Sequence, residues 1–140
     1  MKKIEMVDLK GQYKKIEKEI NDSISNVIEN TSFINGPSVS NFKENLKEYL
    51  GVKHVITCAN GTDALQICLM SLDLKPGDEV ITTDFTFAST VEVIMLLGLT
   101  PVLVDVDPVN FNIDMQKIRK SITKKTKVII PVHLFGQSVD

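Results

Sequence analysis

The sequence is poor in cysteine and contains no long hydrophobic run. Its two cysteines, Cys58 and Cys68, lie in apolar segments, and neither belongs to a C-x-x-C motif or to a His/Cys spacing that binds metal. They are expected to be free, buried thiols of a reducing compartment, and no metal site is predicted. No run reaches the ~18 apolar residues of a membrane span. Because the segment Met1-Lys2-Lys3-Ile4-Glu5 also lacks the apolar core of a signal peptide, a cytoplasmic protein without membrane contact is expected.

An excess of basic residues is also lacking. The 140 residues carry 16 Lys and Arg against 18 Asp and Glu, which gives a net charge of −2. The basic pairs Lys2-Lys3, Lys14-Lys15 and Lys124-Lys125 are short and fit a solvated surface better than a track along a nucleic-acid backbone. A hydrophobic content of 43% and a charged content of 24% are typical of a soluble globular domain, and the length suffices for one real core.

The first third of the chain has helical periodicity. From Gln12 to Asn30, apolar residues recur at steps of three and four, which predicts a helix with one apolar face. Ser38 is the expected N-cap of a second helix that ends at Gly51. The loop between them contains Phe33 and Ile34, which either make a packing contact or contribute weakly to a substrate site.

After Gly51 the pattern alternates between short β-branched runs and helical stretches of about ten residues. Strands are expected at Val55–Cys58, Val80–Thr82, Pro101–Asp105 and Val128–Val132. Helices are expected at Asp63–Leu72, Ala88–Leu97 and Met115–Ile122, the last capped by Asp114. Strands that are apolar on both faces and alternate with helices predict an α/β fold, with a mostly parallel sheet covered by helices.

The stretch Asn60-Gly61-Thr62-Asp63-Ala64-Leu65 reads as a tight turn and a helix start after a strand. The first backbone N–H groups of a helix lack partners and carry partial positive charge, so this end can bind an anion, phosphate above all. Gly61 lets a ligand approach the backbone, and Thr62 or Asp63 can cap the helix. The alternative is a capped helix without a ligand, because the stretch is neither a P-loop nor a G-x-G-x-x-G motif.

In parallel sheets, ligands bind beyond the carboxyl ends of the strands. That edge is expected to carry one site, built from Asn60–Asp63, Asp84–Phe87, Asp105–Asp107 and His133–Phe135. An anion site, an aromatic pair and a histidine suggest a phosphorylated planar ring that stacks on Phe87. The alternatives are core packing for the phenylalanines, a satisfied imidazole for His133, and turn or capping roles for Asp105 and Asp107.

Seven segments together resemble the N-terminal part of the DegT/DnrJ/EryC1/StrS family of pyridoxal-phosphate-dependent sugar aminotransferases. They occur in the family's order and spacing over nearly the whole chain. The segments are Val7-Asp8-Leu9-Lys10-Gly11-Gln12-Tyr13, Phe33-Ile34-Asn35-Gly36-Pro37, Cys58-Ala59-Asn60-Gly61-Thr62-Asp63-Ala64-Leu65, Pro76-Gly77-Asp78-Glu79-Val80-Ile81-Thr82, Thr86-Phe87-Ala88-Ser89-Thr90, Val104-Asp105-Val106-Asp107-Pro108 and Ile130-Pro131-Val132-His133-Leu134-Phe135-Gly136-Gln137.

The resemblance implies a fold-type I aminotransferase that binds pyridoxal 5′-phosphate, with the cofactor phosphate on Gly61, Thr62 and Asp63 and the pyridine ring on Phe87. It implies transfer of an amino group from glutamate to a keto group of a nucleotide-linked sugar in a homodimeric enzyme, usually for surface-polysaccharide synthesis. The Cys-Ala-Asn-Gly-Thr-Asp-Ala-Leu-Gln-Ile run is most similar to enzymes that aminate C3 of a UDP-linked 2-acetamido-3-keto-glucuronic acid. Phe33, Ile34 and His133 are weak candidates for substrate contacts.

The resemblance also implies that catalytic residues are missing from these 140 residues. In the family, the acid that pairs with the pyridine nitrogen and the lysine that forms the Schiff base lie in segments that would follow Asp140. The expected organisation is an N-terminal helical segment (1–50) and the first half of a cofactor-binding domain (51–140). The chain is expected to be an inactive fragment that associates with itself or with the missing part. The alternatives are a non-catalytic phosphate-ligand binder, a regulator or dehydratase of the same superfamily, and a gene remnant.

Overall fold

The computed structural model of the protein describes residues 6–140, and the chain divides into two compact units, Met1–Thr57 and Cys58–Asp140. The basic pair Lys2-Lys3 and the rest of the first five residues lie outside the described part of the chain. None of the described helices is long and apolar enough to cross a membrane.

The first unit consists of the two predicted helices, α1 (Leu9–Glu29) and α2 (Pro37–Leu50). The carboxylate of Asp8 caps α1 by accepting a hydrogen bond of 2.8 Å from the N–H of Gly11. At α2 the predicted N-cap, Ser38, is wrong: Gly36 is the N-cap and Pro37 is the first helical residue. Proline suits that position because its fixed φ is already helical and the N–H that it lacks would be unpaired there. Gly51 ends α2 in the left-handed conformation, with φ +65°, as predicted.

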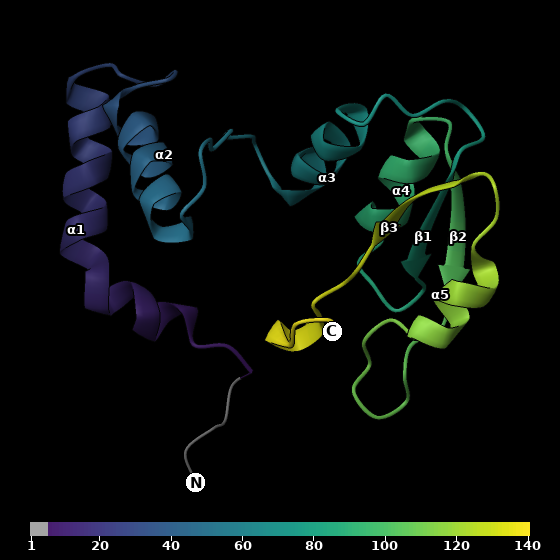
Figure 1. The fold of residues 1–140 in the computed structure, drawn as a ribbon. Helices are drawn as coiled ribbons and strands as arrows, with labels where there is room; N and C mark the ends of the chain where they lie inside the picture. The colour runs from purple at the N-terminus through teal and green to yellow at the C-terminus, as the bar shows by residue number, and fades with distance from the viewer. Residues whose placement is uncertain (1–5) are drawn as a thin grey trace, which may run out of the picture. The chain divides into compact units, whose positions relative to one another are not determined.

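A three-stranded parallel sheet forms the centre of the second unit (Figure 1). The strands are β1 (Glu79–Thr83), β2 (Thr100–Val104) and β3 (Thr126–Ile130), in the order β2-β1-β3. Ile81 of the central strand pairs with Val102 of β2 and Ile129 of β3. Three of the four predicted strands are therefore confirmed.

The fourth predicted strand, Val55–Cys58, is wrong. The segment is irregular in the structure, and it spans the boundary between the two units. An extended run becomes a strand only when its backbone pairs with a neighbouring strand, and it has no such partner within residues 6–140. The side chain of Ile56 is 81% exposed as a result.

Helices cover both faces of the sheet (Figure 1). On one face, α3 (Gly61–Met70) and α4 (Ser89–Leu96) enclose a core that includes Val80, Val93 and Ile94. On the other face, α5 (Met115–Ser121) packs through Ile118 against a core that includes Ile81 and Val104. Val80 and Ile81 serve different cores because successive strand residues point to opposite faces. The predicted α/β fold is confirmed.

The expected burial of the two cysteines is wrong, because both are exposed free thiols. Cys68 lies on α3, where Leu65 and Leu69, one turn apart, pack against the core. The face of α3 that packs against the core is centred on Leu65 and Leu69. Cys68 lies beside this face, and its thiol is exposed. Cys58 belongs to the irregular segment that precedes α3.

Candidate ligand-binding site

The N-terminus of α3 is capped by Asn60. Its backbone is extended, with φ −163° and ψ 177°, and its Oδ1 accepts a hydrogen bond of 2.9 Å from the N–H of Asp63. The capping role predicted for Thr62 or Asp63 is therefore wrong. Asparagine is among the best N-cap residues, because its short side chain reaches the third N–H of the helix.

Capping leaves two backbone donors at this helix end. Within residues 6–140, the N–H groups of Gly61 and Thr62 donate to no acceptor, whereas the N–H of Asp63 is held by Asn60. A side chain added at Gly61 would meet no atom within 4 Å, so the backbone here is open on its outer side. Two adjacent free donors at the positive end of a helix can bind an anion.

These donors face an open pocket of about 570 Å³ whose lining comes from three segments of the second unit. The lining includes Gly61 and Thr62 of α3, Phe87 after β1, and His133 after β3. Four of the residues predicted to form the site are thus brought together. Phe87 is 77% exposed, so its ring is available to a ligand. Asp63 does not line the pocket, because its N–H and carboxylate are both bonded to Asn60.

The polar side chains that line the pocket carry hydroxyl groups and one imidazole. The hydroxyls of Thr86 and Thr90 lie 3.1 Å apart and share a hydrogen bond. Nδ1 of His133 accepts a hydrogen bond of 3.0 Å from the N–H of Val139, which leaves Nε2 as the donor of a neutral ring. Among the described residues, no aspartate, glutamate or lysine lines this pocket.

The other predicted substrate contacts, Phe33 and Ile34, lie in the loop between α1 and α2 of the first unit. Their side chains are 65% and 87% exposed. They remain candidates for binding, because large apolar side chains on a loop are available to a ligand or a partner.

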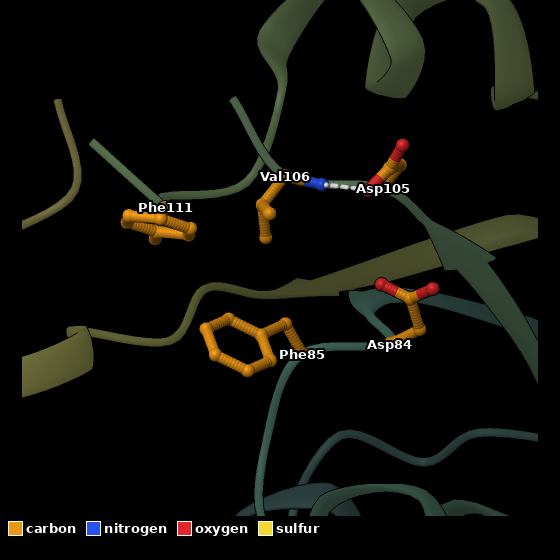
Figure 2. A pocket seen from close by; sticks show the side chains of 5 residues that line it. All are labelled: Asp84, Phe85, Asp105, Val106 and Phe111. Carbon is orange, nitrogen blue, oxygen red and sulfur yellow. Dashed lines mark hydrogen bonds between the residues drawn. The ribbon is translucent and has the colours of Figure 1, made fainter. Parts of the chain in front are cut away.

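The sheet edge carries a second, separate pocket of about 330 Å³. Figure 2 shows Phe85 facing Phe111 across it, with their ring centroids 5.9 Å apart and the rings tilted by 51°. Asp84 and Asp105 lie at its other end. The edge therefore holds two pockets instead of the single expected site, and Phe85 and Phe87 belong to different ones. Residues 84–86 form a bend after the end of β1, so the regular alternation of a strand does not continue through these two positions.

A lysine pairs with one acid of the second pocket. Nζ of Lys117 lies 2.8 Å from Oδ2 of Asp105, whose Oδ1 accepts a 2.8 Å hydrogen bond from the N–H of Val106. The hydrogen bond from Lys117, followed by that from Val106, lowers the pKa of Asp105, and the bond to Asp105 raises the pKa of Lys117. Asp107 accepts hydrogen bonds from the N–H groups of Val109 and Asn110, so it caps a turn.

Sequence reasoning did not find Lys117 or Phe111. Lys117 lies three positions after Asp114, the N-cap of α5, and their side chains are 4.0 Å apart. The contact between Lys117 and Asp105 spans twelve positions, so no local sequence pattern indicates it. Phe111 adopts a left-handed backbone, with φ +60°, in the loop after β2.

Comparison with known proteins shows one family. Residues 14–140 match the model of the DegT/DnrJ/EryC1/StrS aminotransferase family. The chain is 47% identical, over 98% of its length, to the UDP-2-acetamido-2-deoxy-3-oxo-D-glucuronate aminotransferase of Pseudomonas aeruginosa, of which it covers 38%. It is 44% identical, again over 98% of its length, to a pleiotropic regulatory protein of Geobacillus stearothermophilus, of which it covers 37%.

Solved structures agree with this result. A DegT/DnrJ/EryC1/StrS aminotransferase from Brucella abortus superposes with a TM-score of 0.89 at 43% identity, over 99% of this chain and 39% of that one. The NtdA protein of Bacillus subtilis, solved with bound cofactor PMP, superposes with a TM-score of 0.86 at 38% identity, over 90% of this chain and 29% of that one. The chain thus spans well under half the length of these proteins.

Proposed function

Because the chain belongs to the DegT/DnrJ/EryC1/StrS aminotransferase family, we propose that it is part of an enzyme that transfers an amino group from glutamate to a keto group of a nucleotide-linked sugar. The names of two relatives, 47% and 41% identical, describe aminotransferases of UDP-linked 3-oxo sugars. The proposed acceptor is accordingly a UDP-linked 3-keto sugar for surface-polysaccharide synthesis in the cytoplasm. The observation that carries the proposal is the pocket that joins the free N–H groups of α3 to the exposed ring of Phe87.

The pocket fits pyridoxal 5′-phosphate. Gly61 and Thr62 offer two unpaired N–H donors with open space beside them, which suits a phosphate group. Phe87 offers a flat, accessible face for an aromatic ring, and stacking there contributes on the order of 1 kcal/mol. When bound, the cofactor would supply an electron sink.

The remaining residues of the pocket would position the ligand. Leu65 and Ile130 would provide apolar walls. His133 would donate a hydrogen bond through Nε2 to an oxygen of the substrate, because Val139 holds Nδ1. Phe33 and Ile34 would contact the sugar nucleotide. A homodimer is proposed for the whole enzyme, with residues 1–50 as its N-terminal helical segment and residues 51–140 as the first half of its cofactor-binding domain.

A second candidate function is a non-catalytic binder of phosphate ligands or a regulator from the same superfamily. The similarity to a pleiotropic regulatory protein at 44% identity favours it. No lysine lines the pocket among the described residues, so this chain is expected to bind the cofactor without a covalent bond.

Titration of the purified chain with pyridoxal 5′-phosphate tests the proposal. We expect saturable binding that Gly61→Pro weakens roughly tenfold, since the substitution removes an N–H that meets a charged group. Proline suits the first helical position, and the extended backbone of Asn60 is compatible with a following proline. Gly61→Ala keeps the N–H, and its Cβ meets no protein atom within 4 Å, so it should fold as wild type does and should weaken binding less than Gly61→Pro does. Absence of binding, or equal binding by all three proteins, would refute the proposed cofactor site.

A further inference from the structure

The beginning of α4 places polar residues in the same pocket as the N-terminus of α3. Ser89 and Thr90 are the first two residues of α4, and both line the pocket. Only 6% of Ser89 and 5% of Thr90 is exposed. In the described part of the chain, the fully buried side-chain N or O atom without a hydrogen-bond partner is Oδ1 of Asn112, so the hydroxyl of Ser89 is not fully enclosed and stays accessible from the pocket that Ser89 lines.

The hydroxyl groups here have unused donors. The single hydrogen bond between Thr86 and Thr90 uses one hydroxyl proton and leaves the other to donate. Within the described part of the chain, neither the hydroxyl nor the backbone N–H of Ser89 has a hydrogen-bond partner. Ser89 is therefore an unpartnered polar residue that is more than nine-tenths buried at the wall of a pocket.

The electrostatic setting favours an anion. The N-terminal end of α4 carries partial positive charge. Among the residues that the structure describes, no acidic side chain lines the pocket, and His133 is its one titratable side chain. Two acids lie in the first turns of the two helices, Asp63 on α3 and Glu92 on α4. They offset part of the positive potential, but Asp63 is bonded to Asn60 and Glu92 is exposed.

We propose that Ser89 and the hydroxyl pair Thr86–Thr90 form a carboxylate subsite, in the same pocket as the phosphate site at Gly61 and Thr62. The assignment of this carboxylate to a substrate rests on the proposed function. Hydroxyl and N–H donors at a helix end match the oxygen atoms of a carboxylate, and hydrogen bonds to a charged group are the strong ones. The carboxylate can come from the amino-acid donor or from a uronic acid sugar, because both share this chemistry.

Amide chemical shifts of the ¹⁵N-labelled chain test the proposal without any need for activity. Three probes are added separately: L-glutamate, D-glucuronate and inorganic phosphate. We expect at least one of the two carboxylates to shift the amide signals of Ser89 and Thr90, and inorganic phosphate to shift those of Gly61 and Thr62. The carboxylate probe that shifts these signals shows whether the subsite binds the amino-acid donor or the uronic acid sugar.

Substitutions then separate the two subsites. Ser89→Ala and Thr90→Val should each raise the Kd of the carboxylate about tenfold, since each removes a donor to a charged group. The Kd of phosphate should not change. Thr90→Ser keeps the hydroxyl and should restore carboxylate binding, and Ser121→Ala, at the end of α5, serves as a matched control. Dispersed spectra verify that each variant is folded.

The possible failures are distinct. If neither carboxylate shifts Ser89 or Thr90, or if Ser89→Ala and Thr90→Val bind the carboxylate as wild type does, the carboxylate subsite is refuted even when phosphate binds at α3. If phosphate and pyridoxal 5′-phosphate both fail to bind while a carboxylate binds at Ser89, the subsite stands and the proposed function fails.

Discussion

Oδ1 of Asn60 lies 2.9 Å from the backbone nitrogen of Asp63, and this hydrogen bond closes the first turn of α3. It holds the third N–H of the helix and so leaves the first two, those of Gly61 and Thr62, directed toward the pocket. One side chain thereby both begins the helix and determines which backbone donors a ligand can reach.

The cap can be tested by substitution. Asn60→Ala should lower the free energy of unfolding by about 1 kcal/mol, the usual cost of a lost N-cap. Asn60→Asp keeps a side-chain acceptor and should retain most of the stability. Urea unfolding of the three proteins measures the difference. Equal loss in both variants would show that the capping hydrogen bond is not the cause.

Phe87 should contribute to ligand binding and not to folding, because 77% of it is exposed. Phe87→Ala is expected to weaken binding of pyridoxal 5′-phosphate about fivefold, the equivalent of ~1 kcal/mol of stacking, with unchanged stability. Phe85→Ala provides the matched control, since Phe85 lines the other pocket. If both variants bind alike in a fluorescence titration, stacking on Phe87 is excluded.

The ion pair of Asp105 and Lys117 should affect stability at both extremes of pH. The lowered pKa of Asp105 means that its contribution is complete above the ordinary value of 3.8 and is lost as the pH falls through the lowered value. The raised pKa of Lys117 means that its contribution is complete below the ordinary value of 10.5 and is lost as the pH rises through the raised value.

Titration of the Asp105 carboxyl by NMR checks this pair. Lys117→Met should move the pKa of Asp105 upward, toward 3.8, because the strongest cause of its lowering is removed. The hydrogen bond from Val106 remains, so the return should be incomplete. Lys120→Met, on the same helix, should leave the pKa of Asp105 where it is in wild type. A titration unaffected by Lys117→Met would contradict the ion pair.

Ile94 of α4 should be essential to the core, because none of its surface is exposed. Ile94→Ala is expected to lower the free energy of unfolding by about 2–5 kcal/mol through lost burial and a residual cavity. The neighbouring Met95 is 63% exposed. Met95→Ala should therefore change the free energy of unfolding by less than about 0.5 kcal/mol. Denaturant unfolding of both variants compares two adjacent positions of one helix, and similar losses would contradict the assigned packing.

The sheet should promote self-association of the isolated chain. β3 is an edge strand of the described sheet, and Ile129 on it is 43% exposed. Unpaired strand edges with apolar side chains bind other strands. Light scattering is therefore expected to detect species larger than 15.6 kDa, and Ile129→Lys should reduce them. A monodisperse monomer at high concentration would refute this expectation.

Local sequence patterns predicted those elements whose signal is contained in a few neighbouring residues. Helical periodicity predicted α1 and α2, and β-branched runs predicted β1, β2 and β3. Asp114 was recognised as an N-cap, and it accepts hydrogen bonds from the N–H groups of Gln116 and Lys117. The prediction failed at Val55–Cys58, because a strand depends on a partner that a short run of residues does not reveal.

The sequence by itself determined most of the alternation of helices and strands, the family, and the turn at Gly61 that is the candidate anion site, since each is encoded by residue types at short spacing. Only the tertiary structure decided which side chains share a pocket. It separated Phe87 from Phe85, buried Ser89 and Thr90 beside the phosphate candidate, and brought Lys117 to Asp105. These relationships join residues from different strands and helices, and they are set by how those elements pack, which local sequence patterns do not specify.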